Sequence, residues 1–187
     1  YSSSPQTKGG KKADPVRKIS LVDAPGHESL MATMLAGATI MDGALLLISA
    51  NEQCPQPQTR EHLMALEMSG IEKVIVVQNK IDLVSKDEAL ENYKQLKEFL
   101  KNSKFKDAPI IPISARFDVN ISLLLKTIQQ YIPTPQRGDS EDSTMIMARS
   151  FDINKPGYKP KQLTGGVLGG AVKSGNFKIG DEIEIAP

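Results

Sequence analysis

The sequence has few of the features that mark secreted or membrane proteins. Its 187 residues include a single cysteine, so an internal disulfide is excluded and a reducing compartment is expected. No apolar run approaches the about 20 residues that cross a bilayer. The polar start over residues 1–4 is unlike a signal peptide. These absences favour a cytoplasmic protein without a membrane partner.

An excess of charge of one sign is also absent. The chain carries 23 Lys and Arg against 22 Asp and Glu side chains, a net charge of +1, so any contact with RNA must be local. Residues 1–16 are polar and lysine-rich, and we expect a flexible loop or tail there. We interpret Lys8, Lys11 and Lys12 as solvated surface, with contact to RNA phosphate as the alternative.

Short apolar runs alternate with longer amphipathic ones from residue 18 onward, a pattern typical of βαβ units. The short runs are continuously apolar, as in strands that are covered on both faces. They predict strands over 19–22, 44–49, 74–78 and 110–114, with helices over 29–40, 59–69, 85–100 and 121–132. The predicted fold class is therefore α/β, with a doubly wound, mostly parallel sheet.

Two apolar stripes on the predicted helices are interpreted as core rather than as cofactor-binding faces. They comprise Leu90, Tyr93, Leu96, Phe99 and Leu100 in one helix, and Ile121, Leu124, Leu125, Ile128 and Ile132 in another.

The texture of the sequence changes after Pro133-Thr134-Pro135, where a polar run resembles a linker. Beyond it, 145–153, 166–173 and 182–185 are predicted as short strands, with a turn over 178–181. About 45 residues are too few to close a barrel. We therefore expect a loop or tail over 1–16, an α/β domain over 17–135, a linker over 136–143, and the start of a second, β-rich domain over 144–187.

Asp23-Ala24-Pro25-Gly26-His27 follows the first predicted strand, at the sheet edge where α/β proteins bind ligands. A glycine N–H at the start of a helix suits phosphate. The pattern Asp-x-x-Gly alone is also common in ordinary turns, so it needs support from elsewhere in the chain.

That support comes from Asn79-Lys80-Ile81-Asp82, which follows the strand predicted over 74–78. An Asp carboxylate there can accept hydrogen bonds from N1–H and the 2-amino group of guanine, an edge that adenine lacks. The next strand ends in Ser114-Ala115-Arg116, whose backbone N–H groups could contact the guanine carbonyl oxygen. Three motifs at the ends of three predicted strands indicate a guanine nucleotide site.

Together these motifs resemble the G domain of translational GTPases, and within that family the gamma subunits of archaeal and eukaryotic translation initiation factor 2. The resemblance rests on residues 23–67, 78–84, 108–115 and 149–157 and covers nearly everything from residue 17 onward. Elongation factors share its DxPGH and PQTREH elements. NEQCPQPQ at 51–58 and FDINKPG at 151–157 favour the gamma subunits.

By this resemblance, Asp23 holds Mg²⁺ through water, Gly26 contacts the γ-phosphate through its N–H, and His27 orients the attacking water. It assigns the binding of the GTP or GDP base to Asn79, Lys80 and Asp82, with Ser114, Ala115 and Arg116 beside them. For His62 the ordinary helical role is favoured, and Cys54 is interpreted as a buried or loop thiol.

The chain departs from this family in two ways. No G-x-x-x-x-G-K-[ST] phosphate loop and no switch threonine precede Asp23, so we expect the chain to begin after them. Some members carry a zinc knuckle before the DAPGH element, whereas residues 1–16 contain no cysteine, and we expect no zinc.

The resemblance implies that 17–135 is a G domain without its phosphate-loop part and that 144–187 is the start of a β-barrel domain. It implies a GTPase in the intact protein, with this fragment inactive alone. It also implies delivery of initiator methionyl-tRNA to the small ribosomal subunit, with alpha and beta subunits as further partners. Two alternatives stay open: an elongation-type factor that carries another tRNA, and a non-catalytic scaffold that binds protein or RNA.

Overall fold

The computed structural model describes residues 17–23, 41–135 and 142–186. Two sheets are present among them, one of three strands and one of two.

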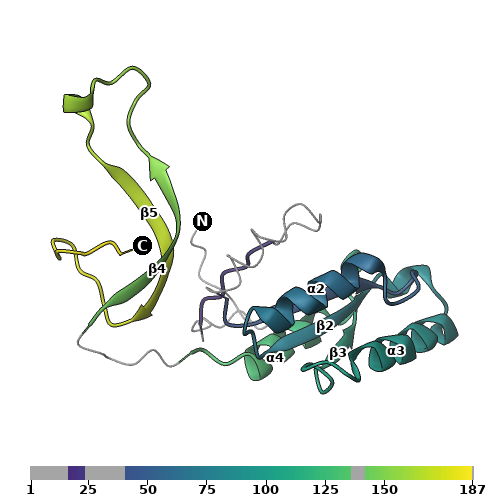
Figure 1. Cartoon of the computed structure of the whole chain (residues 1–187). Coiled ribbons are helices and arrows are strands. Elements are labelled where there is room, and N and C mark those ends of the chain that lie inside the picture. The colour runs from purple at the N-terminus through teal and green to yellow at the C-terminus, as the bar shows by residue number, and fades with distance from the viewer. Residues whose placement is uncertain (1–16, 24–40, 136–141, 187) are drawn as a thin grey trace, which may run out of the picture.

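The larger sheet is parallel and has the strand order β1-β2-β3 (Figure 1). Its strands are β1 (Ala44–Ser49), β2 (Val74–Asn79) and β3 (Ile110–Pro112). Ala44 lies opposite Val74, and Val76 lies opposite Ile110. The three corresponding predicted strands and the α/β class are confirmed, although β3 stops at Pro112, before the predicted end.

Capping residues and proline set several of the helix ends. The helices are α2 (Pro57–Met68), α3 (Lys86–Leu100) and α4 (Ile121–Tyr131). Pro57 occupies the first turn of α2, where a missing N–H costs nothing. Ser85 and Glu88 form the capping box of α3: Ser85 Oγ accepts from Glu88 N–H at 3.3 Å, and Glu88 Oε2 accepts from Ser85 N–H at 2.8 Å. Gly70, just after α2, has a φ of +76° that suits glycine.

Side chains alternate across β2 and supply two separate cores. Val74 and Val76 face the cluster formed with α2 and α3, while Ile75 and Val77 face the cluster formed with α4. All four are at most 1% exposed. Figure 1 shows the helices packed around this sheet. The doubly covered β2 explains its continuously apolar sequence.

The helical stripes are only partly buried. Leu96 and Leu100 of α3 are fully enclosed, but Leu90 and Tyr93 lie at the surface, as does Leu125 of α4. Leu90 points about 120° around the helix from Leu96, too far to share its contacts. Asn92 takes part of the buried face instead.

The prediction of a buried strand over 19–22 is wrong. These residues have no strand structure, and Leu21 is 81% exposed. An apolar run becomes a strand only where a neighbour supplies hydrogen-bond partners. Among the described residues, no strand pairs with this segment. Arg17 holds its beginning, donating from Nη1 to Ile132 O at 2.6 Å and from Nη2 to Ile128 O at 2.9 Å, at the end of α4.

The second sheet is a long antiparallel hairpin of β4 (Thr144–Asp152) and β5 (Gly166–Ser174) (Figure 1). Between these strands lies the short 3₁₀ helix η3 (Pro160–Gln162). The turn predicted over 178–181 is present, since Lys178 N–H donates to Asp181 Oδ2 at 2.7 Å. The strand predicted over 182–185 is absent, because no partner strand pairs with these exposed residues in the described part of the chain.

Among the helices that the structure describes, none combines the length and apolar character needed to cross a bilayer.

Candidate functional site: the carboxyl edge of the parallel sheet

Asn79 joins two loops at the carboxyl edge of the sheet. It is the last residue of β2, and its Oδ1 accepts from Lys80 N–H at 2.8 Å and from Ala115 N–H at 3.2 Å. Asn79 O accepts from Ala50 N–H at 2.8 Å, which also ties it to the chain leaving β1. One side chain therefore brings together the motifs predicted at 79–82 and 114–116.

Lys80 and Asp82 lie on a sharp turn directly after β2. Lys80 has a φ of +62°, and the 3₁₀ helix η2 (Ile81–Leu83) follows it. Ile81 N–H donates to Ile113 O at 3.3 Å, and Leu83 N–H donates to Lys80 O at 3.0 Å. The side chains of Lys80 and Asp82 are both exposed, so they are accessible to a ligand at this edge.

The segment after β3 forms a small closed loop. Ser114 and Val119 exchange two backbone hydrogen bonds of 3.1–3.2 Å, and buried Ser114 Oγ accepts from Phe117 N–H at 3.3 Å. Asn120 Nδ2 donates to Pro112 O at 2.8 Å and fastens the loop at its other end. Sequence reasoning missed this role of Asn120, which follows the motif by several residues.

Two of the N–H groups expected to face a base carbonyl, those of Ser114 and Ala115, donate to other groups of the protein. Ser114 N–H donates to Val119 O, and Ala115 N–H donates to Asn79 Oδ1. A base oxygen would therefore share or replace the 3.2 Å bond to Asn79. Arg116 is exposed, and its guanidinium carbon lies 5.4 Å from the ring centroid of Phe117.

Backbone strain concentrates at this edge. The non-glycine residues with positive φ in the described chain are Lys80, Asp118 and Asn120, at +62°, +55° and +59°. All three belong to the two loops that Asn79 connects. Such conformations cost free energy, persist where the surroundings enforce them, and cluster at ligand sites.

The predicted phosphate-side residues are placed less fully. Asp23 is an exposed carboxylate in the irregular segment that contains residues 17–23. Gly26 and His27 lie outside the described residues, as does the predicted helix over 29–40. The described structure therefore brings together the base-side residues and does not join Asp23 to them.

Mg²⁺ prefers hard oxygen ligands and commonly keeps several waters, with one or two carboxylates and the substrate phosphates completing its shell. The exposed Asp23 carboxylate fits that use, while no group of three acidic, His or Cys residues in the described ranges could hold a metal alone.

Cys54 and His62 take the ordinary roles expected of them. Cys54 is buried in the core against α2 and α3, and burial raises the pKa of its thiol to about 11, although Arg60 acts in the opposite direction. The neutral thiol is a poor nucleophile. His62 lies within α2, at the partly buried surface.

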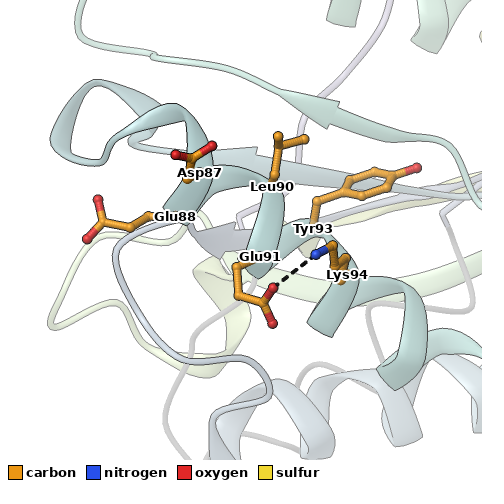
Figure 2. A pocket seen from close by; sticks show the side chains of 6 residues that line it. All are labelled: Asp87, Glu88, Leu90, Glu91, Tyr93 and Lys94. Atoms are coloured by element: carbon orange, nitrogen blue, oxygen red, sulfur yellow. Dashed lines mark hydrogen bonds and ion pairs between the residues drawn. The ribbon is translucent and has the colours of Figure 1, made fainter.

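A hollow over the first turns of α3 is the other candidate site (Figure 2). It is lined by Asp87, Glu88, Leu90, Glu91, Tyr93 and Lys94. Glu91 and Lys94 form an exposed ion pair at 3.3 Å, which water largely screens. Hydrogen bonds from Ser85 hold the pKa of Glu88 below its usual value, an effect of helix capping. Glu88, Glu91 and Lys94 are engaged in these contacts on the surface of one helix, so the hollow offers no catalytic arrangement.

The comparisons with known proteins agree with the geometry. Residues 7–134 match the family model described as the elongation factor Tu GTP binding domain. The chain is 63% identical over 172 residues to translation initiation factor 2 subunit gamma of Methanocaldococcus jannaschii, covering 92% of the chain and 42% of that protein. Its identity to the same subunit of Pyrococcus horikoshii is 56% over 188 residues, covering 100% of the chain and 46% of that protein. The chain thus spans less than half the length of these relatives.

Among solved structures, the chain is similar to translation elongation factor SelB from Methanococcus maripaludis. The apo form matches with a TM-score of 0.67 and 30% identity, covering 87% of this chain and 34% of that one. The complex of SelB with the GTP analogue GPPNHP matches with a TM-score of 0.69 and 29% identity, covering 85% and 34%.

Proposed function

The chain belongs to the elongation factor Tu GTP-binding domain family, and on that basis we propose that the intact protein is a GTP-dependent switch of translation initiation. Its GTP-bound state would carry initiator methionyl-tRNA to the small ribosomal subunit in the cytoplasm, and GTP hydrolysis would release it. The observation that carries the nucleotide part is the joining of the 79–82 and 114–116 loops by Asn79.

The base-side chemistry follows from donors and acceptors at the sheet edge. Asp82, held on η2 directly after the strained turn at Lys80, would accept from N1–H and the 2-amino group of guanine. The Lys80 stem would lie along the base, and Ala115 N–H would contact its carbonyl oxygen. A site of this kind rejects adenine strongly, because mispaired polar groups would stay buried and unsatisfied.

On the phosphate side, Asp23 would hold Mg²⁺ through water and Gly26 N–H would contact the γ-phosphate. His27 would orient the attacking water. The metal would neutralise charge on the phosphates when bound. These roles follow from the positions of these residues in the DAPGH motif.

The initiation role is supported by the relatives that are 56–63% identical and named translation initiation factor 2 subunit gamma. We accordingly propose alpha and beta subunits as partners. An elongation-type function is the alternative, suggested by SelB at 29–30% identity. Binding of initiator and elongator methionyl-tRNA by the GTP-loaded intact protein separates the two, since an initiation factor should prefer the initiator and an elongation factor should not.

The substitution Asp82→Asn in the intact protein tests the nucleotide site. It should weaken GTP and favour xanthosine triphosphate, whose 2-oxo group needs a donor rather than an acceptor. Asp107→Asn, an exposed carboxylate outside these loops, is the matched control and should leave both affinities unchanged. Unchanged GTP affinity in Asp82→Asn, measured by calorimetric titration, would remove Asp82 from the site.

A further inference from the structure

Two buried amide side chains lie next to the loops proposed to bind the base, residues 79–82 and 114–116. Gln78, the residue before Asn79, is 2% exposed, and Asn92 of α3 is 4% exposed. Gln78 shares its face of β2 with Val74 and Val76, where the alternation of the strand would otherwise place an apolar side chain. A polar pair thus replaces apolar packing at the end of the strand that leads into Asn79.

The hydrogen bonds of this pair point in fixed directions. Gln78 Nε2 donates to Ala89 O and to Asn92 Oδ1, both at 2.9 Å. Asn92 Nδ2 donates to Glu52 O at 2.8 Å, in the loop that leaves β1. The pair therefore ties the end of β2 to α3 and to the neighbouring loop.

The same region is also held through the backbone. Gln78 O accepts from Ile113 N–H at 2.8 Å, and Asn79 O accepts from Ala50 N–H at 2.8 Å. Two apolar side chains of similar size would fill the same space but could pack in more than one orientation. Buried amides whose hydrogen bonds are all made allow a single arrangement of the strand end, the helix and the loop. The strained turn at Lys80 begins two residues after Gln78, and such a turn needs surroundings that enforce it.

From this arrangement we infer that Gln78 and Asn92 are positioning residues for guanine recognition. They hold the end of β2 so that Asn79 connects the two loops and Asp82 faces the base. The inference rests on the proposed nucleotide site and adds residues that do not touch the ligand.

The test separates positioning from stability by removing both amides together. Replacing both partners of a buried hydrogen bond by apolar groups of similar shape can leave stability nearly unchanged, whereas a single replacement strands a buried polar group. The variant is Gln78→Met combined with Asn92→Leu in the intact protein. GDP and xanthosine diphosphate affinities are titrated, and the unfolding midpoint is measured on the same samples.

We expect a GDP Kd raised about tenfold, the size of a single weakened contact, and a xanthosine diphosphate Kd that changes little. The unfolding midpoint should fall modestly, because Ala89 O and Glu52 O each lose a side-chain donor. Partial unfolding would weaken both nucleotides by the same factor. A fall in the preference for GDP is therefore specific to positioning. An unchanged preference in the folded double variant would overturn the inference.

Gln95→Leu is the matched control. Gln95 lies one turn from Asn92 on α3, and its Oε1 accepts from Cys54 N–H at 3.0 Å, so it holds the same loop. The Gln78 amide instead donates to Ala89 O and Asn92 Oδ1. It should leave the nucleotide preference unchanged. An equal fall in Gln95→Leu would also overturn the inference, because the effect would then arise from the loop.

If the double variant fails to fold, Asn92→Ser removes the Asn92 amide with a smaller change in packing. A lower preference for GDP supports the inference, and an unchanged one refutes it. Two failures can be told apart. If the wild-type protein does not bind GDP, the proposed nucleotide site is wrong. If the wild-type protein binds GDP and the variant shows the same preference, only the positioning role is wrong.

Discussion

The substitution Asn79→Ala should loosen both loops at the carboxyl edge of the sheet. Asn79 Oδ1 accepts from Lys80 N–H at 2.8 Å and from Ala115 N–H at 3.2 Å, and alanine removes both bonds. Each neutral hydrogen bond contributes about 0.5–1.5 kcal/mol net, so together they hold the loops by about 1–3 kcal/mol. Because Lys80 and Ala115 are both exposed to water, we expect a loss in the lower half of that range.

Hydrogen exchange of the Lys80 and Ala115 amides in the intact protein measures this effect directly. A loss in this lower half, about 1–2 kcal/mol, speeds exchange by about 5- to 30-fold. Asn79→Asp is the informative control, because its carboxylate can still accept from both N–H groups while the amide donor to a base is gone. It should keep slow exchange and still lose GTP affinity.

Two results would refute this reasoning. Wild-type exchange in Asn79→Ala would show that Asn79 does not hold the loops. Exchange in Asn79→Asp as fast as in Asn79→Ala would show that the acceptor atom is not what matters.

Three further predictions concern other residues. Cys54, with a pKa of about 11 raised by burial, should react with iodoacetamide at pH 8 about 100-fold more slowly than an exposed cysteine, and rapid native-state alkylation seen by mass spectrometry would contradict its burial. Hydrogen bonds from Ser85 lower the pKa of Glu88 below 4.5, so the stability that its capping contributes is present above pH 4.5 and is lost as the pH falls through the folded-state pKa. The difference in melting temperature between wild type and Glu88→Gln should therefore shrink in acid. A difference that does not depend on pH would reject this assignment. His27→Ala should slow single-turnover GTP hydrolysis by about 10²-fold or more and leave GTP affinity nearly unchanged, whereas an unchanged rate constant would return His27 to a structural role.

The parts of the fold that the sequence predicts well are those with local or strongly periodic causes. The capping box at Ser85 and the glycine after α2 fix helix ends through neighbouring residues. The apolar run at 74–78 is a strand covered on both faces, as its composition indicates. The prediction that Leu90 and Tyr93 belong to the core is wrong, because the spacing of apolar residues along a helix does not show how wide a face of the helix the sheet covers.

The sequence predicts that the proposed base-side residues lie together, but it does not predict the contacts that hold them there. The order of Asn79, Asp82 and Ser114 after two strand ends places them at one edge, because parallel strands end together. The pairing of Gln78 with Asn92 has no such pattern, since a lone Gln at a strand end and a lone Asn in a helix are individually ordinary. Only their contact across 14 residues of sequence identifies them.

The two halves of the proposed nucleotide site depend on different kinds of interaction. Base-side residues leave strands that are hydrogen-bonded to neighbours, so the backbone ladder sets their positions. Asp23 instead belongs to a segment that pairs with no strand among the described residues. In the described residues, this segment is held by the Arg17 guanidinium, which donates to two carbonyls at the end of α4. The positive charge of Arg17 suits the carboxyl end of α4. It holds the segment at one residue, whereas strand pairing would hold several residues in a row. Because α4 also follows the 114–120 loop, the segment that carries the proposed Mg²⁺ carboxylate and the loop proposed to contact the base are attached to opposite ends of one helix.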